Sequence, residues 1–430
     1  MKLCLITLGC PKNTVEGEKL AGLIEKHGWS LTTKLDGADA AVIHTCSFIK
    51  DAKEESMQGI ASLSELKKSG AIGKLFVTGC LVQEERSTLR GRFPLVDGIL
   101  GTGELEKLPA MLSGRKQDLT FEPGGLLDTN APRLLSSDIP SAYLRIAEGC
   151  DHTCSFCAIP SLRGGYKSRE MGNITGEATE LARRGIKELV LIAQDTTFYG
   201  KDIYSAFRLP ALLRKLAAID GIEWIRILYA YPDTLTDEML ETIGLEPKIC
   251  KYLDIPLQHV SAGVLRKMRR KPGGLQLIRK IKSRFPDMAL RTTFITGFPG
   301  ETKKDFSELL EAVSGGWFDH VGVFEFSPHP GTRSFGMPGK ISEAVKKERK
   351  KELMLMQRNV VRAKNKSLAG SLQKVLVEGV LKGGNYVGRA SFQAPEIDNL
   401  VYFSGKPKPG PFQRVKITGY KGYDLTGKII

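Results

Sequence analysis

The sequence predicts an α/β protein with an N-terminal parallel-sheet α/β domain, a central partial (βα)6 TIM-like barrel and a small C-terminal antiparallel β-barrel. Strand-like and helical segments alternate over the first 120 residues, six more such units run from about 140 to 330, and short alternating segments follow from about 368. A chain of 430 residues is also too long for one core. We therefore expect three domains, at residues 1–120, 136–365 and 366–430.

In the first domain, three apolar segments each end in a cysteine. "KLCLITLGC", "DAAVIHTC" and "KLFVTGC" end at Cys10, Cys46 and Cys80, and helical sequence follows each of them, in the first case from about Val15. Because the carboxyl ends of parallel strands lie along one edge of a sheet, the three cysteines should converge there. Buried strand-end cysteines are the structural alternative. That alternative fits Cys4 and Cys250 better, since both lie inside apolar segments.

Residues from about 121 to 140 are rich in Gly, Pro, Ser and Asp, which predicts a linker. The alternation then resumes through six predicted strands, and polar or Gly/Pro residues follow each strand directly. We expect the chemistry of this domain at the carboxyl ends of those strands. The strands are "AYLRIAEGC", "ELVLIAQDTT", "EWIRILYAYP", "KYLDIPLQH", "ALRTTFITGFPG" and "DHVGVFEFSP".

The first of these strands runs into "EGCDHTCSFCAIP", which places Cys150, Cys154 and Cys157 within eight positions. Structural zinc prefers four ligands, often two Cys-x-x-Cys pairs, and no partner pair lies nearby. His152 could serve as a fourth ligand only by an awkward reach within the same loop. A 4Fe–4S cluster fits better, because three thiolates hold it and leave one iron open to another ligand.

The C-terminal part is strongly basic. The whole chain has a net charge of +15, and residues 340–430 carry 19 Lys and Arg against 7 Asp and Glu, a balance of +12. A helical connector over residues 341–367 leads to segments typical of a small OB-like barrel. A basic barrel predicts a polyanionic partner, most simply RNA. A solvated basic surface or a purely structural cap are the alternatives.

The cysteine loop, with Phe156 before its last cysteine, resembles the signature of the radical S-adenosylmethionine (SAM) enzymes. Together with the N-terminal cysteines and the basic barrel, it makes nearly the whole chain similar to the radical SAM methylthiotransferases, whose C-terminal barrel is called TRAM. The resemblance implies two 4Fe–4S clusters and SAM as cofactors. Cys10, Cys46 and Cys80 would bind the first cluster, and Cys150, Cys154 and Cys157 would bind the second, which also binds SAM; all six would be catalytic.

The family has a tRNA branch and a ribosomal-protein branch. "GCPKN", "AIPSLRGGYKSR" and "DIPLQH" are similar to the ribosomal-protein branch, whereas the tRNA branch has Gln-Met-Asn after the first cysteine. "NTVEGE" departs from the Asp-Ser-Glu expected there. The resemblance implies methylthiolation of the β-carbon of an aspartate in small-subunit ribosomal protein 12. Methylthiolation of a tRNA adenosine, or a non-enzymatic metal-containing RNA-binding protein, are the alternatives.

The resemblance also implies the reaction and its helpers. A radical from SAM removes a hydrogen from the aspartate β-carbon, the first cluster supplies sulfur, and a second SAM supplies the methyl group. Weaker site candidates follow the strands, each with a structural alternative such as a helix cap or a solvated face. The candidates for contacting SAM are Phe156, Gln194, Asp195 and Gln258, and those for lining the site or gripping the substrate are His259, Gly297, Glu301, Arg163, Lys167 and Arg169.

The expected partners are ribosomal protein 12, free or on the ribosome, RNA at the C-terminal barrel, and a low-potential electron donor. No apolar run approaches the roughly 18 residues of a membrane span, and no signal peptide opens the chain. These features predict a cytoplasmic protein, in which clustered cysteines hold metal more often than they form disulfides.

Overall fold

The computed structural model describes residues 1–114, 118–119, 123 and 132–430. Its N-terminal part is a parallel sheet with strand order β2-β1-β3-β4-β5-β6. Apolar side chains are buried on both faces, as is usual for a parallel sheet covered by helices. The strands and helices are β1 (Lys2–Thr7), α1 (Pro11–Lys26), β2 (Ser30–Leu31), β3 (Ala38–Thr45), α2 (Lys50–Lys68), β4 (Ile72–Gly79), α3 (Cys80–Glu84), α4 (Leu89–Arg92), β5 (Gly98–Leu100), α5 (Leu108–Leu112) and β6 (Asp118–Leu119).

Helix α1 begins at Pro11, four residues before the predicted start near Val15. Proline suits the first turn of a helix because its missing N–H would have no partner there. Cys10 is the residue directly before this helix. Because the helix starts earlier than predicted, Cys10 lies at the N-terminal end of α1 and not within a loop.

The central part contains the six predicted strands in two parallel sheets of three, ordered β11-β10-β7 and β12-β13-β14. A parallel bridge between Ile225 and Ile249 joins the two sheets, so the partial barrel is confirmed. The strands are β7 (Ser141–Arg145), β10 (Glu188–Ile192), β11 (Trp224–Ile227), β12 (Tyr252–Asp254), β13 (Ala289–Thr296) and β14 (His320–Glu325). The helices are α6 (Ile159–Arg163), α7 (Met171–Arg183), α8 (Leu209–Ala217), α9 (Asp237–Leu245), α10 (Ala262–Lys267), α11 (Gly274–Arg284), α12 (Lys303–Ser314) and α13 (Glu343–Leu368), and β8 (Ala147–Glu148) pairs with β9 (Lys167–Ser168).

The C-terminal part is a closed five-stranded barrel in the order β15-β16-β17-β19-β18. Its pairs are antiparallel except β17 with β19, which run parallel. The predicted small antiparallel β-barrel is therefore confirmed, with one parallel pair, because an odd number of strands cannot close with every neighbour antiparallel. The strands are β15 (Leu372–Leu381), β16 (Asn385–Ala390), β17 (Val401–Ser404), β18 (Phe412–Lys421) and β19 (Asp424–Ile429).

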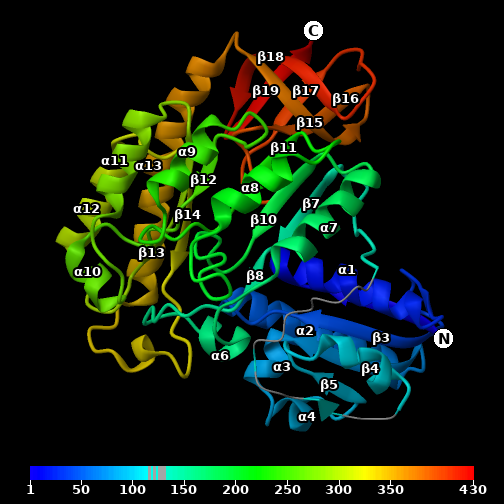
Figure 1. Ribbon diagram of the computed structural model, residues 1–430. Coiled ribbons are helices and arrows are strands. Elements are labelled where there is room, and N and C mark those ends of the chain that lie inside the picture. The colour runs from blue at the N-terminus through cyan, green and yellow to red at the C-terminus, as the bar shows by residue number, and fades with distance from the viewer. Residues whose placement is uncertain (115–117, 120–122, 124–131) are drawn as a thin grey trace.

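The N-terminal and C-terminal parts both pack against the central barrel. The C-terminal barrel lies at one end of it and the N-terminal sheet at the other, with α1 running beside β7 (Figure 1). One buried apolar cluster joins Val15 of α1, Tyr143 and Val190 of the central strands, and Leu376 of the C-terminal barrel. The central strands are therefore in apolar contact with both α1 and the C-terminal barrel.

Two sequence predictions concern the connections. Half of the predicted linker at 121–140 lies outside the described residues, and residues 132–140 form neither helix nor strand. The domain boundaries stay a prediction, and α13 runs past the proposed division at residue 365. Among the described residues, no helix is both long and apolar enough to span a membrane.

Candidate functional site

The N-terminal cysteines lie at the carboxyl ends of three neighbouring strands. Cys10 precedes α1 after β1, Cys46 directly follows β3, and Cys80 begins α3 after β4. Gly9 has a φ of +99°, and a Cβ on it would lie 2.4 Å from the Cβ of Cys46. The chain before Cys10 therefore approaches Cys46 so closely that only glycine fits.

Side-chain hydrogen bonds fix the backbone around these cysteines. Asn13 Nδ2 donates to the carbonyl oxygens of Leu8, at 2.7 Å, and Thr45, at 3.0 Å, which lie beside Cys10 and Cys46 in sequence. Ser56 Oγ accepts from the Cys46 amide at 3.0 Å and donates to its carbonyl at 2.7 Å. Cys10 and Cys46 are thus held by residues of the helices that follow them.

The second set of cysteines lies in the loop between β8 and α6. The Cys150 amide donates to the Gly164 carbonyl at 3.1 Å, which closes the loop. Gly149 has a φ of +76°, and a Cβ on it would lie 2.0 Å from the Gly165 oxygen, so glycine is required before the first cysteine. Ser155 anchors the loop centre through bonds from its amide to the Met268 carbonyl and from its Oγ to the Lys267 carbonyl.

The six thiols are chemically suited to a metal cluster. All are free, and burial raises the pKa of Cys80, Cys150 and Cys157 to about 12 and that of Cys46 above its usual value. A thiol of this kind loses its proton on binding metal, so cluster binding would release protons. In the described part of the chain no three Cys, His, Asp or Glu side chains are placed to share a single ion. Thiolates are the usual ligands of 4Fe–4S clusters, so three sulfur donors in each set are chemically compatible with such a cluster.

His152, which the sequence offered as a possible fourth zinc ligand, contacts other residues. Its Nε2 lies 2.7 Å from Asp195 Oδ2, and its ring stacks on Tyr231 with 3.6 Å between ring centres. The histidine therefore ties the cysteine loop to the residues after β10 and β11. This placement leaves the three cysteines of the loop without a histidine partner.

A buried ion cluster joins the two cysteine-bearing regions. Glu16 of α1 accepts from Arg163 Nη1 at 2.5 Å, Arg145 Nη1 at 2.8 Å and His44 Nε2 at 3.0 Å. Burial alone would raise the pKa of Glu16, but Arg163, His44 and Arg145 outweigh it and hold the pKa far below its usual range. Arg163 Nη2 also donates to Asn13 Oδ1 at 2.7 Å. The helix after Cys157 is therefore bonded to the helix after Cys10.

Gln194 and Asp195 follow β10 at its carboxyl end, beside the cysteine loop. Gln194 Nε2 donates to Glu148 Oε1, and Glu148 Oε2 accepts from Arg145 Nη1 at 2.8 Å. Asp195 accepts from the Thr197 amide at 2.9 Å as well as contacting His152. Both residues follow the second central strand, and their contact with SAM stays a prediction.

Gln258 and His259 lie beyond their predicted strand end, because β12 stops at Asp254. Gln258 has a φ of +69° and forms an isolated bridge with Phe294 of β13. His259 is buried and accepts a 3.0 Å bond from the Ser261 amide at Nδ1, and burial lowers its pKa to about 4. It is therefore a neutral histidine at neutral pH.

The remaining candidates divide into buried and exposed groups. The ring of Phe156 packs against the cluster around Phe298. Arg163 and Arg169 are buried in ion pairs, whereas Lys167 is exposed. The solvated basic face considered for these three was therefore wrong for the two arginines, because carboxylates from other elements cover them.

Glu301 is buried, and its carboxylate does not merely favour a helix dipole. It accepts from the Gly297 amide at 2.8 Å and from Arg349 Nη1 at 2.6 Å. Thr302 is the residue that caps α12. Glu301 therefore shapes the Gly297 turn and links it to α13.

Two cations near the cysteines were missed as site residues. Arg270 Nη1 lies 3.8 Å from Cys154 Sγ, and its guanidinium stacks on Tyr231 at 4.3 Å. Lys12 is only 9% exposed and places Nζ 3.7 Å from the centre of the Tyr229 ring. "GCPKN" drew attention to Lys12 as a branch marker, but only the packing of α1 against the central barrel shows that it is buried.

Lys12 is near both cysteine sets. Its charge interacts with Cys10. Burial raises the pKa of Cys157, and the positive charge of Lys12 partly counteracts that rise. Lys12 of α1 therefore influences the charge of cysteines in both sets.

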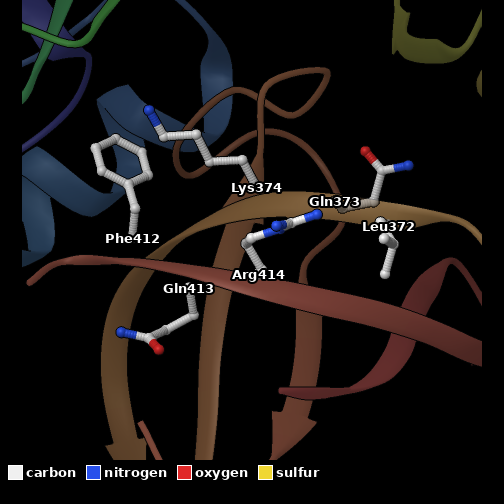
Figure 2. Close-up of a pocket in the computed structure, with 6 residues that line it drawn as sticks. All are labelled: Leu372, Gln373, Lys374, Phe412, Gln413 and Arg414. Carbon is white, nitrogen blue, oxygen red and sulfur yellow. The ribbon is translucent and has the colours of Figure 1, made fainter. Parts of the chain in front are cut away.

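A surface hollow lies on the C-terminal barrel and is lined by none of the six candidate cysteines (Figure 2). Lys374 Nζ lies 4.1 Å from the centre of the Phe412 ring and 2.6 Å from Glu223, while Arg414 on the neighbouring strand is exposed. A basic aromatic surface of this kind suits stacking and phosphate contacts. The lining residues are Leu372, Gln373, Lys374, Phe412, Gln413 and Arg414.

Comparisons with known proteins agree with this architecture. Residues 2–101 match the Uncharacterized protein family UPF0004, residues 144–313 the Radical SAM superfamily and residues 369–430 the TRAM domain. A protein of Endomicrobium trichonymphae named ribosomal protein uS12 methylthiotransferase RimO is 47% identical over 98% of this chain and 97% of its own length. Proteins with the same name from Pelotomaculum thermopropionicum and Geobacter sulfurreducens are 44% and 43% identical, over 100% of this chain and 99% and 98% of theirs.

Among solved structures, the radical SAM methyltransferase TsrM of Kitasatospora setae, bound to tryptophan and a SAM analogue, is similar with a TM-score of 0.58. The alignment covers 87% of this chain and 78% of that one at 13% identity. At this identity the likeness concerns the fold. It supports the arrangement of the central strands described above.

Proposed function

The chain belongs to the RimO family of ribosomal protein uS12 methylthiotransferases, and we propose that it methylthiolates the β-carbon of an aspartate side chain of uS12. It is a radical SAM enzyme that uses SAM and 4Fe–4S clusters. The observation that carries the proposal is the match at 43–47% identity over nearly the full length of these relatives. The tRNA alternative is not better supported.

Cys10, Cys46 and Cys80 would hold one cluster, and Cys150, Cys154 and Cys157 would hold the SAM-binding cluster. When bound, these groups and SAM supply the reducing electron, the 5′-deoxyadenosyl radical, the sulfur and the methyl group. The protein's own task is to position them and to keep water and competing hydrogen donors away from the radical. The buried cluster around Glu16 serves that task by holding both cysteine regions in one fixed relation.

Other residues would position SAM and the substrate. Gln194 and Asp195 lie at the carboxyl end of β10 beside Cys150, where they would hydrogen-bond SAM. Gln258 would contact the same ligand from the opposite sheet. The positive φ of Gln258 fits such a role, since strained backbone is concentrated at functional sites.

The C-terminal barrel would meet uS12 or the ribosomal RNA around it. Lys374, Phe412 and Arg414 form the basic aromatic surface available for RNA. The TRAM match and the charge of +12 over residues 340–430 support this contact. An electron donor of low potential completes the proposed set of partners.

Anaerobic reconstitution followed by iron and sulfide analysis tests the two-cluster assignment. We expect about eight irons per chain. Cys150→Ala should abolish 5′-deoxyadenosine formation, whereas Cys10→Ala should preserve it and lose sulfur insertion. About four irons, or zinc, in the wild-type protein would contradict the assignment.

The substrate is tested in cells that lack this chain. Mass spectrometry should show that the uS12 aspartate has lost its methylthio group while tRNA nucleosides are unchanged. Loss of a tRNA methylthio group with uS12 unaffected would instead favour the tRNA alternative.

A further inference from the structure

We propose that Lys12 binds the carboxylate of the target side chain and thereby selects an acidic residue as the substrate. The proposal rests on the function proposed above and names the residue that would make uS12 aspartate recognisable. Lys12 would be a specificity-determining residue. It would act by charge and hydrogen bonding and would form no covalent bond.

The first observation is the isolation of the Lys12 ammonium group. Lys12 is 9% exposed, and its Nζ lies 3.7 Å from the centre of the Tyr229 ring. It makes no hydrogen bond or ion pair within the described part of the chain. Lysine is rarely buried without a carboxylate, because losing water around the charge is costly. An incoming anion would offset that cost.

Two carboxylates whose charges interact with Lys12, those of Glu148 and Asp254, already have other partners. Glu148 accepts from Arg145 and Gln194. Asp254 accepts from the Tyr229 amide at 3.1 Å and lies 3.8 Å from Arg291. These acids therefore leave the cation free for a ligand from outside the chain.

The second observation is position. Lys12 lies in the first turn of α1, two residues after Cys10, and its charge also reaches Cys157 of the other set. The substrate proposed for the site carries its carboxylate directly on the reacting β-carbon, so holding the carboxylate also fixes which hydrogen faces the radical. Proximity of this kind is a main source of rate and selectivity.

The backbone supports such a role for Tyr229. This residue has a φ of +61°, a conformation that is unusual for tyrosine, directly after β11. The strained turn carries the ring under the Lys12 ammonium. An ammonium group has three N–H donors, and a ring face occupies only one side of it, so donors are left for an anion.

Binding measurements test the proposal without relying on turnover. Reconstituted holoenzyme would be titrated against labelled uS12 carrying either aspartate or asparagine at the modified position. Lys12→Met should weaken binding of the aspartate form roughly 10- to 100-fold, the size of a hydrogen bond between charged groups, and leave the asparagine form unchanged. Lys12→Arg should restore most of the affinity. Lys26→Met, at the exposed end of the same helix, is the matched control and should behave as wild type.

Other outcomes separate the possible failures. If Lys12→Met binds each uS12 form as tightly as wild type does, the proposal for Lys12 is wrong while the proposed function stands. The same holds if Lys12→Met loses affinity for the aspartate and asparagine forms equally. Loss of iron from Lys12→Met would show that the lysine balances cluster charge, which would also overturn it. If wild-type holoenzyme neither binds nor modifies uS12, the proposed function itself fails and this inference fails with it.

Discussion

Arg163 Nη2 lies 2.7 Å from Asn13 Oδ1, so the helix that follows Cys157 is bonded to the helix that follows Cys10. Through Arg163 Nη1 the same side chain also reaches Glu16. The relative position of the two cysteine sets therefore depends on a few buried charged groups. Such groups are costly to bury and more costly to leave unpaired.

We expect Arg163→Gln to lower the free energy of unfolding by about 3–5 kcal/mol, because Glu16 and Glu148 would keep buried charge with one cation fewer. Denaturant unfolding of the apoprotein measures the change. Arg183→Gln is the control, since Arg183 is exposed and its 3.7 Å ion pair with Glu180 lies on the helix surface. That variant should differ from wild type by less than about 0.5 kcal/mol.

In the reconstituted enzyme, Arg163→Gln should separate the two halves of the reaction. In the proposed mechanism, cleavage of SAM depends on the Cys150 loop and should persist, whereas sulfur insertion also needs the N-terminal cysteine set in register. The ratio of 5′-deoxyadenosine to methylthiolated uS12 should therefore rise. An unchanged ratio would show that the two sets are aligned by other contacts.

Much of this site was predictable because its cysteines mark strand ends. Parallel strands bring their carboxyl ends together, so Cys10, Cys46 and Cys80 could be placed on one edge from sequence alone. The same rule placed Gln194 and Asp195 beside the Cys150 loop. Local pattern and topology were sufficient for these residues.

The contacts between domains were not predictable in this way. Glu16, His44 and Arg145 come from three separate elements, and nothing in their local sequence shows that they meet. The burial of Lys12 likewise depends on how α1 packs against the central barrel. Such contacts are determined by tertiary packing, which periodicity and motif spacing do not encode.

A second buried ion cluster, of two arginines and one glutamate, should hold the C-terminal barrel to the central barrel. Arg389 of β16 and Arg226 of β11 both donate to Glu188 of β10, and all three side chains are fully buried. The pKa of Glu188 falls to about 2, because the two arginines outweigh the effect of burial. Glu188→Gln should cost about 3–5 kcal/mol. The expected stability loss appears as an earlier midpoint in denaturant unfolding.

The matched control for this pair is Glu223→Gln. Glu223 also joins the core to the C-terminal barrel, through a 2.6 Å contact with Lys374, but both side chains are 40% or more exposed. Solvent screens such a pair, so its removal should cost less than about 1 kcal/mol. Similar losses in the two variants would contradict the role given to burial.

Gly9→Ala should displace Cys46 and reduce cluster binding at the N-terminal set. The added methyl would lie 2.4 Å from the Cys46 Cβ, and the φ of +99° is unfavourable for alanine. Gly28→Ala controls for the backbone effect, since Gly28 has a φ of +76° with open space around it. Iron analysis should find about four irons in Gly9→Ala and about eight in Gly28→Ala. Full loading of Gly9→Ala would show that the edge tolerates the methyl group.

The contact between His329 and Glu84 should make stability depend on pH. His329 Nε2 lies 3.3 Å from Glu84 Oε1 and joins the segment after β14 to the end of α3. Glu84 raises the pKa of His329 above 6.5, so this histidine stabilises the fold fully below that pH and loses its effect as pH rises through the raised value. Burial opposes the shift of Glu84, but His329 and Lys53 lower its pKa to about 2, so its contribution is present above about 4.5 and is lost as pH falls toward 2.

The raised pKa of His329 and the lowered pKa of Glu84 together predict that the pair stabilises the fold most between about pH 4.5 and 6.5. In that range it should add roughly 1 kcal/mol to the free energy of unfolding. His329→Gln should therefore lower the unfolding midpoint most within that window and least at pH 9. Denaturant unfolding of the wild type and the variant across pH 5 to 9 measures the difference. His27→Gln is the control, because His27 is exposed and forms no ion pair within the described residues. A difference between wild type and His329→Gln that stays constant from pH 5 to 9 would show that His329 acts by packing and not by charge.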